Sequence, residues 1–237
     1  MSTPNKKRIA LVLPAYNEGQ VVRSVVADLT SAFSKAAYTY QIIVVDDCSS
    51  DNTSSEAASA GAYVIRHLIN TGSGGATATG LRYCEEHDFD IAITCDADGQ
   101  HAAEDVISGV RKLIEQDADL LIGSRLLQGG EMSRTKILGN AGLSIITNLL
   151  FGVRVTDSQS GLRVFSRRAL AVLRWKSSGY EFCSEMLWRA RQSGLLIGEF
   201  PIRSIYTEYS KAKGQNNWNA VNIIKSLLQR RIIELFE

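Results

Sequence analysis

Two aspartates separated by one alanine, Asp96 and Asp98, have the residue type and spacing that suit metal chemistry. They follow residues 90–95, a largely apolar run typical of a buried strand. In an extended chain, side chains two positions apart point to the same side, about 6–7 Å apart, so these carboxylates repel each other unless a cation lies with them. Mg²⁺ and Mn²⁺ prefer such oxygen ligands and commonly also bind phosphate oxygens. A solvated Asp-rich turn is the alternative interpretation.

Residues suited to ligand binding also follow other predicted strands. Three such strands are residues 9–13 before Pro14, 41–45 before Asp46 and 119–123 before Arg125. Apolar strands that alternate with helices indicate an α/β, Rossmann-like fold with a mostly parallel sheet and helices on both faces. Ligands of such sheets bind beyond the carboxyl ends of the strands. We therefore expect these residues to lie at one edge of the sheet, together with the two aspartates.

The remaining elements are predicted from hydrophobic periodicity. Helical spacing indicates helices at residues 18–33, 51–60, 76–86, 106–115, 133–151 and 184–192. A further strand is expected at 62–66, and a strand followed by a helix at 162–172. The Gly-rich turn at 72–75 lacks the dinucleotide-binding fingerprint, because Thr77 occupies the place of the third glycine. Its glycines are expected to provide a tight turn and close helix packing.

Six motifs follow one another along the chain. They are PAYNE (14–18), VDDCSSD (45–51), NTGSGGA (70–76), DADGQ (96–100), GSR (123–125) and TDSQSGLR (156–163). Together they resemble the family 2 glycosyltransferases, which have the GT-A fold, and the resemblance runs from about residue 9 to residue 209. The narrower similarity is to the branch that transfers hexoses to polyprenyl phosphates such as dolichyl phosphate. It is carried by the DADGQH stretch, the DxQxGxR segment, and Glu181 and Glu185 before Arg189.

The resemblance implies a nucleotide-sugar donor site at the carboxyl edge of the sheet. Five residues would border the nucleobase and ribose: Pro14, Ala15, Tyr16, Glu18 and Asp46. Three residues would hold Mg²⁺ or Mn²⁺ against the diphosphate: Asp96, Asp98 and Gln100. Ala97, between the aspartates, belongs to the same donor site, and Arg203 and Lys211 lie in a late loop that could close over the diphosphate. His101 is expected at the surface or behind the metal ligands.

The implied reaction is inverting transfer of a hexose from a UDP- or GDP-sugar to a polyprenyl phosphate. Arg125 would contact phosphate through its planar guanidinium. A phosphate acceptor is already anionic, whereas a sugar hydroxyl needs a general base, and Asp157 and Glu185 are the candidates for that role. Both could instead be structural: Asp157 could bind backbone N–H groups and Glu185 could pair with Arg189. Two alternatives stay open: transfer to a saccharide or lipid-linked sugar hydroxyl in cell-surface polysaccharide assembly, and a non-catalytic nucleotide-sugar-binding regulator.

We expect one GT-A domain at residues 9–215, after a flexible tail at 1–8 and before an amphipathic helix at 216–237. That helix could pack on the core, lie on a membrane as a peripheral contact, or form a homo-oligomer contact. Residues 1–119 contain 9 Lys and Arg against 17 Asp and Glu, and residues 120–237 contain 17 against 8, so an acidic half suits a metal and a basic half suits anions. Four cysteines without CxxC spacing and no recognisable secretory leader favour a cytoplasmic location. Membrane contact through the C-terminal helix would place the protein at the inner face of the membrane. No nucleic-acid partner is expected.

Overall fold

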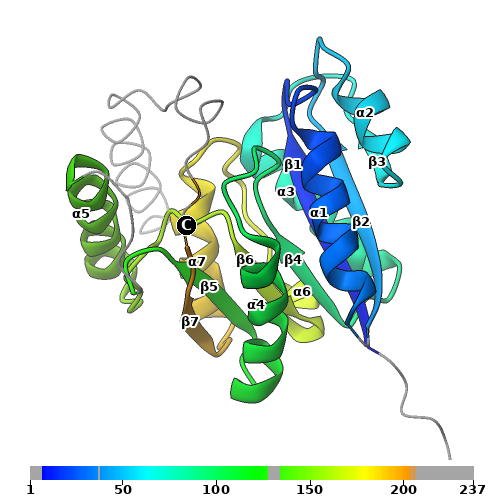
Figure 1. Ribbon diagram of the computed structural model, residues 1–237. Helices are drawn as coiled ribbons and strands as arrows, with labels where there is room; N and C mark the ends of the chain where they lie inside the picture. Colours follow the sequence, from blue (N-terminus) through cyan, green and yellow to red (C-terminus); the bar gives the residue numbers. More distant parts are fainter. Residues whose placement is uncertain (1–6, 37, 128–133, 204, 206–237) are drawn as a thin grey trace, which may run out of the picture.

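The computed structural model describes residues 7–36, 38–127, 134–203 and 205. A seven-stranded sheet runs through the middle of this part of the chain (Figure 1). In the spatial order β3-β2-β1-β4-β6-β5-β7, its strands are Tyr63–Arg66, Thr39–Asp46, Arg8–Ala15, Ile91–Thr94, Arg163–Ser166, Leu120–Ser124 and Ile197–Pro201. All pair in parallel except β6, which runs antiparallel to both β4 and β5. The predicted mostly parallel sheet is confirmed.

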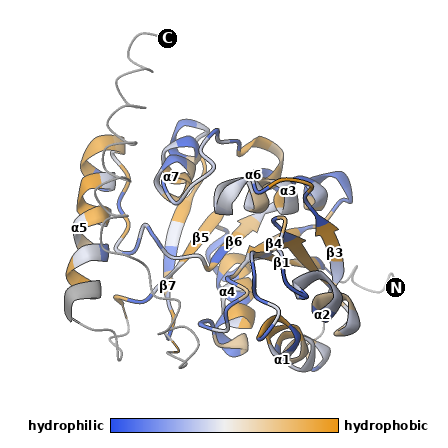
Figure 2. Cartoon of the chain, turned by 90° about the horizontal axis from the view of Figure 1, so that it is seen from above, coloured by the Kyte–Doolittle hydropathy of each residue, from blue (hydrophilic) through white to orange (hydrophobic). Residues whose placement is uncertain are grey.

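Helices cover both faces of the sheet, as predicted (Figure 2). One face is covered by α1 (Val22–Ser34), α2 (Thr53–Ser59) and α4 (Ala103–Gln116), and the other by α3 (Gly72–Glu86), α6 (Arg167–Val172) and α7 (Phe182–Gln192). Helix α5 (Arg134–Phe151) lies outside these two layers, beyond the β7 edge of the sheet. Among the described residues, no helix combines the length and the apolar character needed to cross a membrane.

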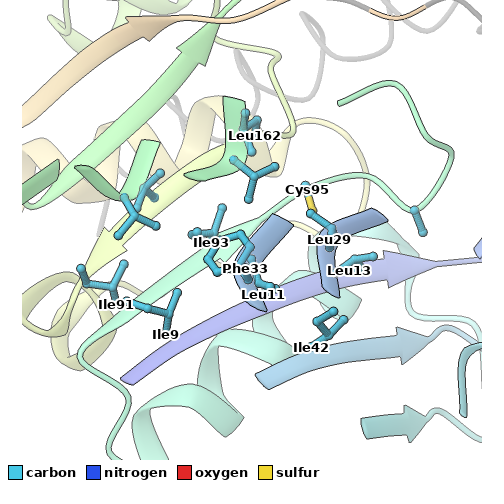
Figure 3. Close-up of a cluster of buried hydrophobic side chains, with 14 of the residues drawn as sticks. Ile9, Leu11, Leu13, Leu29, Phe33, Ile42, Ile91, Ile93, Cys95 and Leu162 are labelled. Carbon is cyan, nitrogen blue, oxygen red and sulfur yellow. The ribbon is translucent and has the colours of Figure 1, made fainter. Parts of the chain in front are cut away.

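The hydrophobic core holds the strands in a rigid frame. Side chains alternate between the two faces of a strand, so Leu11 of β1 packs with Phe33 of α1 (Figure 3), whereas Val12, one position on, faces α3. Helix α3 comes very close to the sheet at Gly80, where a Cβ atom would lie 2.2 Å from Cγ1 of Val12. An interior packed this closely has low compressibility, so it forms a rigid frame for the strand ends.

Helix α3 begins four residues earlier than predicted, at Gly72 instead of Ala76. The carboxylate of Asp47 accepts hydrogen bonds from the backbone N–H groups of Thr71 (2.8 Å) and Gly72 (2.7 Å). These bonds satisfy donors that a helix leaves unpaired at its start, and the negative charge is favourable there. The expected close packing of the glycines is also present, because a Cβ at Gly72 would lie 2.5 Å from the carbonyl oxygen of Ser178.

The other predicted helices are present, with ends that differ by a few residues. The strand and helix expected at residues 162–172 are β6 and α6. Three predictions about the ends of the chain lie wholly or mostly outside the described residues: the tail at 1–8, the domain boundary at 215 and the amphipathic helix at 216–237.

Candidate active site

The loops that follow β1 and β2 are bonded to each other at the carboxyl edge of the sheet. The backbone N–H of Asn17 donates to Oγ of Ser49 (2.9 Å), and that of Glu18 donates to Oγ1 of Thr53 (2.8 Å). Asn17 has a φ angle of 55°, a left-handed conformation that asparagine adopts more readily than most residues. These bonds fix the position of the PAYNE motif, the first segment of the predicted donor site.

Tyr16 and Asp46, both predicted to meet the nucleobase or ribose, have different surroundings. Tyr16 exposes 49% of its surface, whereas Asp46 is completely buried. The Asp46 carboxylate accepts hydrogen bonds from the backbone N–H of Ser49 (2.8 Å) and from the hydroxyl of Ser54. A direct contact between Asp46 and a nucleotide would require these bonds to change, while Tyr16 already presents an aromatic surface. The other predicted donor residues are partly or fully buried at this edge: Pro14, Ala15, Glu18 and Ala97.

Asp98 lies beyond the end of β4 and is held by Gln100. One carboxylate oxygen accepts the backbone N–H of Gln100 (3.0 Å), and the other accepts its side-chain Nε2 (2.7 Å). Burial first, and then the negative charges of Asp96 and Glu18, raise the pKa of Asp98 to about 6. A bound cation would remove this cost of ionisation, because it stabilises the charged form.

The residues of the acidic motif fit a divalent cation. Within the described part of the chain, no group of three or more His, Cys, Asp or Glu side chains is arranged as a metal site, so a cation here would also need oxygens from water or phosphate. Mg²⁺ and Mn²⁺ commonly bind in this way. Gly161 leaves the necessary room, because a Cβ there would lie 2.5 Å from both carboxylate oxygens of Asp96. Only glycine keeps the space in front of these oxygens open.

Asp96 is held differently from Asp98. Nε2 of His101 lies 3.2 Å from Oδ2 of Asp96. Partial desolvation acts to raise the pKa of Asp96, but the hydrogen bond with His101 and the positive charges of two nearby arginines, Arg125 and Arg163, outweigh it and lower the pKa. Asp96 therefore stays ionised under conditions in which its neighbour Asp98 takes up a proton.

Arg163 braces the turn that faces Asp96. Its side chain is buried and donates to the carbonyl oxygens of Ser158 (2.7 Å), Ser160 (3.0 Å) and Cys183 (3.1 Å). These bonds join the turn at residues 157–161 to α7. The sequence interpretation gave neither Arg163 nor Gly161 a role, although both stand in the DxQxGxR segment that carried the family resemblance.

Arg125 and Asp157 form a two-pronged ion pair. Nε of Arg125 donates to Oδ2 of Asp157 (2.7 Å), and Nη2 donates to Oδ1 (2.8 Å). Asp157 is completely buried, whereas the Arg125 side chain is 20% exposed. The structure thus brings these two predicted catalytic residues together, with the carboxylate of Asp157 orienting the guanidinium of Arg125.

Glu185 lies in α7 and anchors the loop that precedes this helix. Its carboxylate accepts the backbone N–H groups of Lys176 (3.0 Å) and Ser177 (2.9 Å), and also the hydroxyl of Ser177. Nε of Arg189, one helical turn on, lies 3.8 Å away. Glu185 has no exposed surface. These contacts fix the loop at residues 176–177 against α7.

The late segment that follows β7 passes next to the metal motif. The backbone N–H of Ile205 donates to the carbonyl oxygen of Gln100 (3.1 Å), and that of Arg203 donates to Oδ2 of Asp105 (2.8 Å). The exposed guanidinium of Arg203 lies 3.8 Å from the carboxylates of Glu104 and Asp105, at the start of α4. Lys211, the other residue predicted to close over the diphosphate, lies outside the described residues.

Comparison with known proteins places the chain in a family. Residues 10–174 match the family described as glycosyl transferase family 2. The chain is 41% identical over 249 residues to the UDP-N-acetylglucosamine–dolichyl-phosphate N-acetylglucosaminyltransferase of Methanococcus voltae, covering 95% of this chain and 97% of that relative. It is 30% identical over 220 residues to the undecaprenyl-phosphate mannosyltransferase of Micrococcus luteus, covering 87% of each chain.

The fold also has a solved counterpart. It is similar to that of glucosyl-3-phosphoglycerate synthase from Mycobacterium tuberculosis, solved with Mn²⁺, UDP and glucosyl-3-phosphoglycerate, with a TM-score of 0.71, 18% identity, and coverage of 95% of this chain and 80% of that one. The sheet and its two helical layers are those of the GT-A fold. The chain belongs to glycosyltransferase family 2. The resemblance and the fold predicted from the motifs are confirmed.

Proposed function

We propose that this protein is a metal-dependent, inverting glycosyltransferase that moves a hexose, or its N-acetylamino derivative, from a UDP- or GDP-sugar to a polyprenyl phosphate. The observation that carries the proposal is the pair Asp96 and Asp98, with Gln100, at the carboxyl end of β4. The names of the two relatives contain dolichyl phosphate and undecaprenyl phosphate, which supports this class of acceptor. UDP-N-acetylglucosamine, from the name of the first relative, is the donor to test first.

Transfer to a phosphate requires no proton acceptor. The acceptor oxygen is anionic and can attack C1 of the donor sugar, while the bond from C1 to the diphosphate oxygen breaks and the nucleoside diphosphate leaves with the electron pair. Asp96, Asp98 and Gln100 would hold Mg²⁺ or Mn²⁺, which neutralises a departing diphosphate. Arg125 supplies positive charge close enough to lower the pKa of Asp96, and Asp157 fixes its orientation.

The two alternative functions receive less support. A sugar hydroxyl acceptor would need a general base, yet Asp157 and Glu185 are both completely buried and their carboxylates accept hydrogen bonds within the protein. A non-catalytic regulator would not need both carboxylates of the acidic motif. Hydrolysis of the donor in the presence of Mn²⁺ would exclude the regulator.

A screen of donors and acceptors tests the proposed function. Purified protein is incubated with UDP- and GDP-sugars, Mg²⁺ or Mn²⁺, and either a polyprenyl phosphate or a saccharide acceptor, and the products are identified by mass. We expect a polyprenyl phosphate sugar, formed only with a divalent cation. Product formation in excess EDTA would contradict the metal dependence, and a saccharide product alone would contradict the acceptor.

Replacement of Glu185 distinguishes an anchor from a general base. Glu185→Gln weakens at least one charged hydrogen bond to the loop at 176–177, so we expect the free energy of unfolding to fall by about 1–3 kcal/mol. Turnover, measured well below the unfolding temperature, should stay within about tenfold of the wild type, because a phosphate acceptor needs no base. Thermal unfolding and kcat are measured on the same samples. Abolished turnover with unchanged stability would favour the hydroxyl acceptor.

The outer face of α5 supports contact with the membrane that contains such an acceptor. Leu138, Ile145 and Leu149 expose 76%, 58% and 80% of their surfaces and lie along one side of the helix, which is coloured largely hydrophobic in Figure 2. Residues 137–151 include no charged side chain. An apolar face of this kind is typical of helices that lie on a lipid surface. Peripheral membrane contact is therefore part of the proposal.

Charged substitutions on α5 test this contact. We expect Leu138→Glu combined with Leu149→Glu to weaken binding to anionic lipid vesicles at least about tenfold, because each buried leucine contributes about 1.5–3 kcal/mol. Vesicle co-sedimentation measures the effect, and Ile114→Glu on α4, a position exposed to 42%, is the matched control. Unchanged vesicle binding by the double variant would contradict the proposal. Loss of a dimer in size-exclusion chromatography would instead assign this face to a homo-oligomer.

A further inference from the structure

His101 is buried beside the acidic motif and contacts one of its aspartates. The side chain is 6% exposed, and Nε2 lies 3.2 Å from Oδ2 of Asp96. An ionised carboxylate can only accept a hydrogen bond, so the proton of this bond belongs to the imidazole and Nε2 is the donor. His101 therefore restrains Oδ2 of Asp96.

The second ring nitrogen of His101, Nδ1, does not hold a metal-motif residue in this way. Nδ1 is buried, and it has no hydrogen-bond partner among the described residues. Buried polar atoms are nearly always paired, because an unpaired one costs stability. A phenylalanine would fill a similar volume without this cost. The contact with Asp96 is thus the feature of His101 that an apolar ring could not supply.

Gly161 acts on the same carboxylate from another direction. A Cβ at this position would lie 2.5 Å from both oxygens of Asp96, so the glycine keeps the space in front of them open. Its backbone is held in place, since its carbonyl oxygen accepts a hydrogen bond from Oγ1 of Thr94 (2.9 Å) at the end of β4. Asp96 thus faces an open space while one of its oxygens is restrained by His101.

We propose that His101 is a positioning residue of the metal site, which holds the Asp96 carboxylate in the orientation that binds the cation. The inference rests on the proposed metal-dependent function. Groups that hydrogen-bond to metal ligands fix the orientation of those ligands, and their loss typically weakens metal binding about 10–100-fold.

The test measures Mn²⁺ affinity of the metal-free protein by calorimetry, at one fixed pH, together with the unfolding temperature. We expect His101→Phe to bind Mn²⁺ about 10–100-fold more weakly and to unfold at the same or a higher temperature. In the assay, the Mn²⁺ concentration needed for half-maximal rate should rise, while kcat at saturating Mn²⁺ changes less. His101→Gln, whose amide can donate to Asp96, should recover most of the affinity. His87→Phe, at an exposed position on the far end of α3, is the matched control.

The outcomes separate this inference from the proposed function. If the wild type binds Mn²⁺ and His101→Phe binds it equally well, the positioning role is wrong and the metal-dependent function stands. If His101→Phe fails to fold, His101→Gln decides the matter, since weak Mn²⁺ binding by a folded glutamine variant would overturn the role of the hydrogen bond. A wild type that binds neither Mn²⁺ nor Mg²⁺, with or without the donor, would overturn the proposed function and this inference with it.

Discussion

Asp98→Asn is expected to make the metal-free protein more stable and to remove nearly all of its activity. The folded-state pKa of Asp98, about 6, is higher than the value of about 3.9 expected in an unfolded chain. Ionised Asp98 therefore destabilises the folded protein, by an amount on the order of 3 kcal/mol. Asparagine keeps an oxygen that can accept the N–H of Gln100 but carries no charge, so it removes this cost.

The stability difference between Asp98→Asn and the wild type depends on pH, because the pKa of Asp98 is raised in the folded state. Below about pH 4, Asp98 is protonated in both the folded and the unfolded state and contributes no difference. As pH rises from about 4 to 6, the folded state holds the proton more tightly, so stability of the metal-free wild type falls relative to Asp98→Asn. Above pH 6 the difference is complete, and we expect the variant to unfold several degrees higher, at about 2–4 °C per kcal/mol for a domain of this size.

With bound metal, we expect the wild type to become the more stable of the two proteins. Saturating Mn²⁺ should raise the unfolding temperature of the wild type, because a ligand that binds only the folded state stabilises it. It should leave Asp98→Asn nearly unchanged. Turnover should fall by about 10²–10³-fold or more, as for the loss of a group that stabilises transition-state charge. Thermal unfolding in EDTA and in Mn²⁺ at pH 5 and 8, with kcat at pH 8, measures these effects. A variant that is less stable than the wild type in EDTA at pH 8 would refute the explanation.

Gly161→Ala is expected to abolish metal binding although the substitution adds one methyl group. That methyl group would lie 2.5 Å from both oxygens of Asp96, which is less than any tolerated contact, so the carboxylate or the turn must move. A misplacement of about 1 Å at a reacting centre can lower the rate about 100-fold. Stability should change little, because the atoms that must move are at the end of a side chain that is 54% exposed.

Gly142→Ala provides the control for this substitution. Gly142 lies in α5, and a Cβ there would have no neighbour within 4 Å. Alanine favours the helix over glycine by about 1 kcal/mol, so this variant should be slightly more stable and should bind Mn²⁺ as the wild type does. Calorimetric titration with Mn²⁺ compares the two variants. Wild-type affinity in Gly161→Ala would show that Asp96 can move aside without loss of the site.

The two aspartates of the motif differ in how readily they ionise. Asp96 is kept ionised by His101 and by arginine side chains, and Gly161 leaves room in front of it. Asp98 is held by Gln100, and the negative charge of Glu18 helps to raise its pKa. One carboxylate thus stays ionised without a cation, and the other takes up a proton more readily unless a cation is near. This difference follows from their neighbours, because both are aspartates at the end of the same strand.

Local sequence determined the fold class and the position of the acidic motif. Residues 42–45 and 91–93 are apolar throughout, as is typical of strands covered on both faces, and we expected the carboxylates that follow them at the carboxyl edge of a parallel sheet. The order of the short motifs added the family. These features depend on neighbouring residues in the chain, so they could be predicted without the tertiary structure.

Only the tertiary structure decided what the polar side chains contact. Asp46, Asp157 and Glu185 are carboxylates that the sequence alone could assign to a substrate, yet all three are buried and accept hydrogen bonds within the protein. His101 and Gly161 meet at Asp96 although 60 residues separate them, because β6 brings the turn before it against the end of β4. Asp157 likewise pairs with Arg125, 32 positions away, and spacing along the sequence does not specify contacts of this kind.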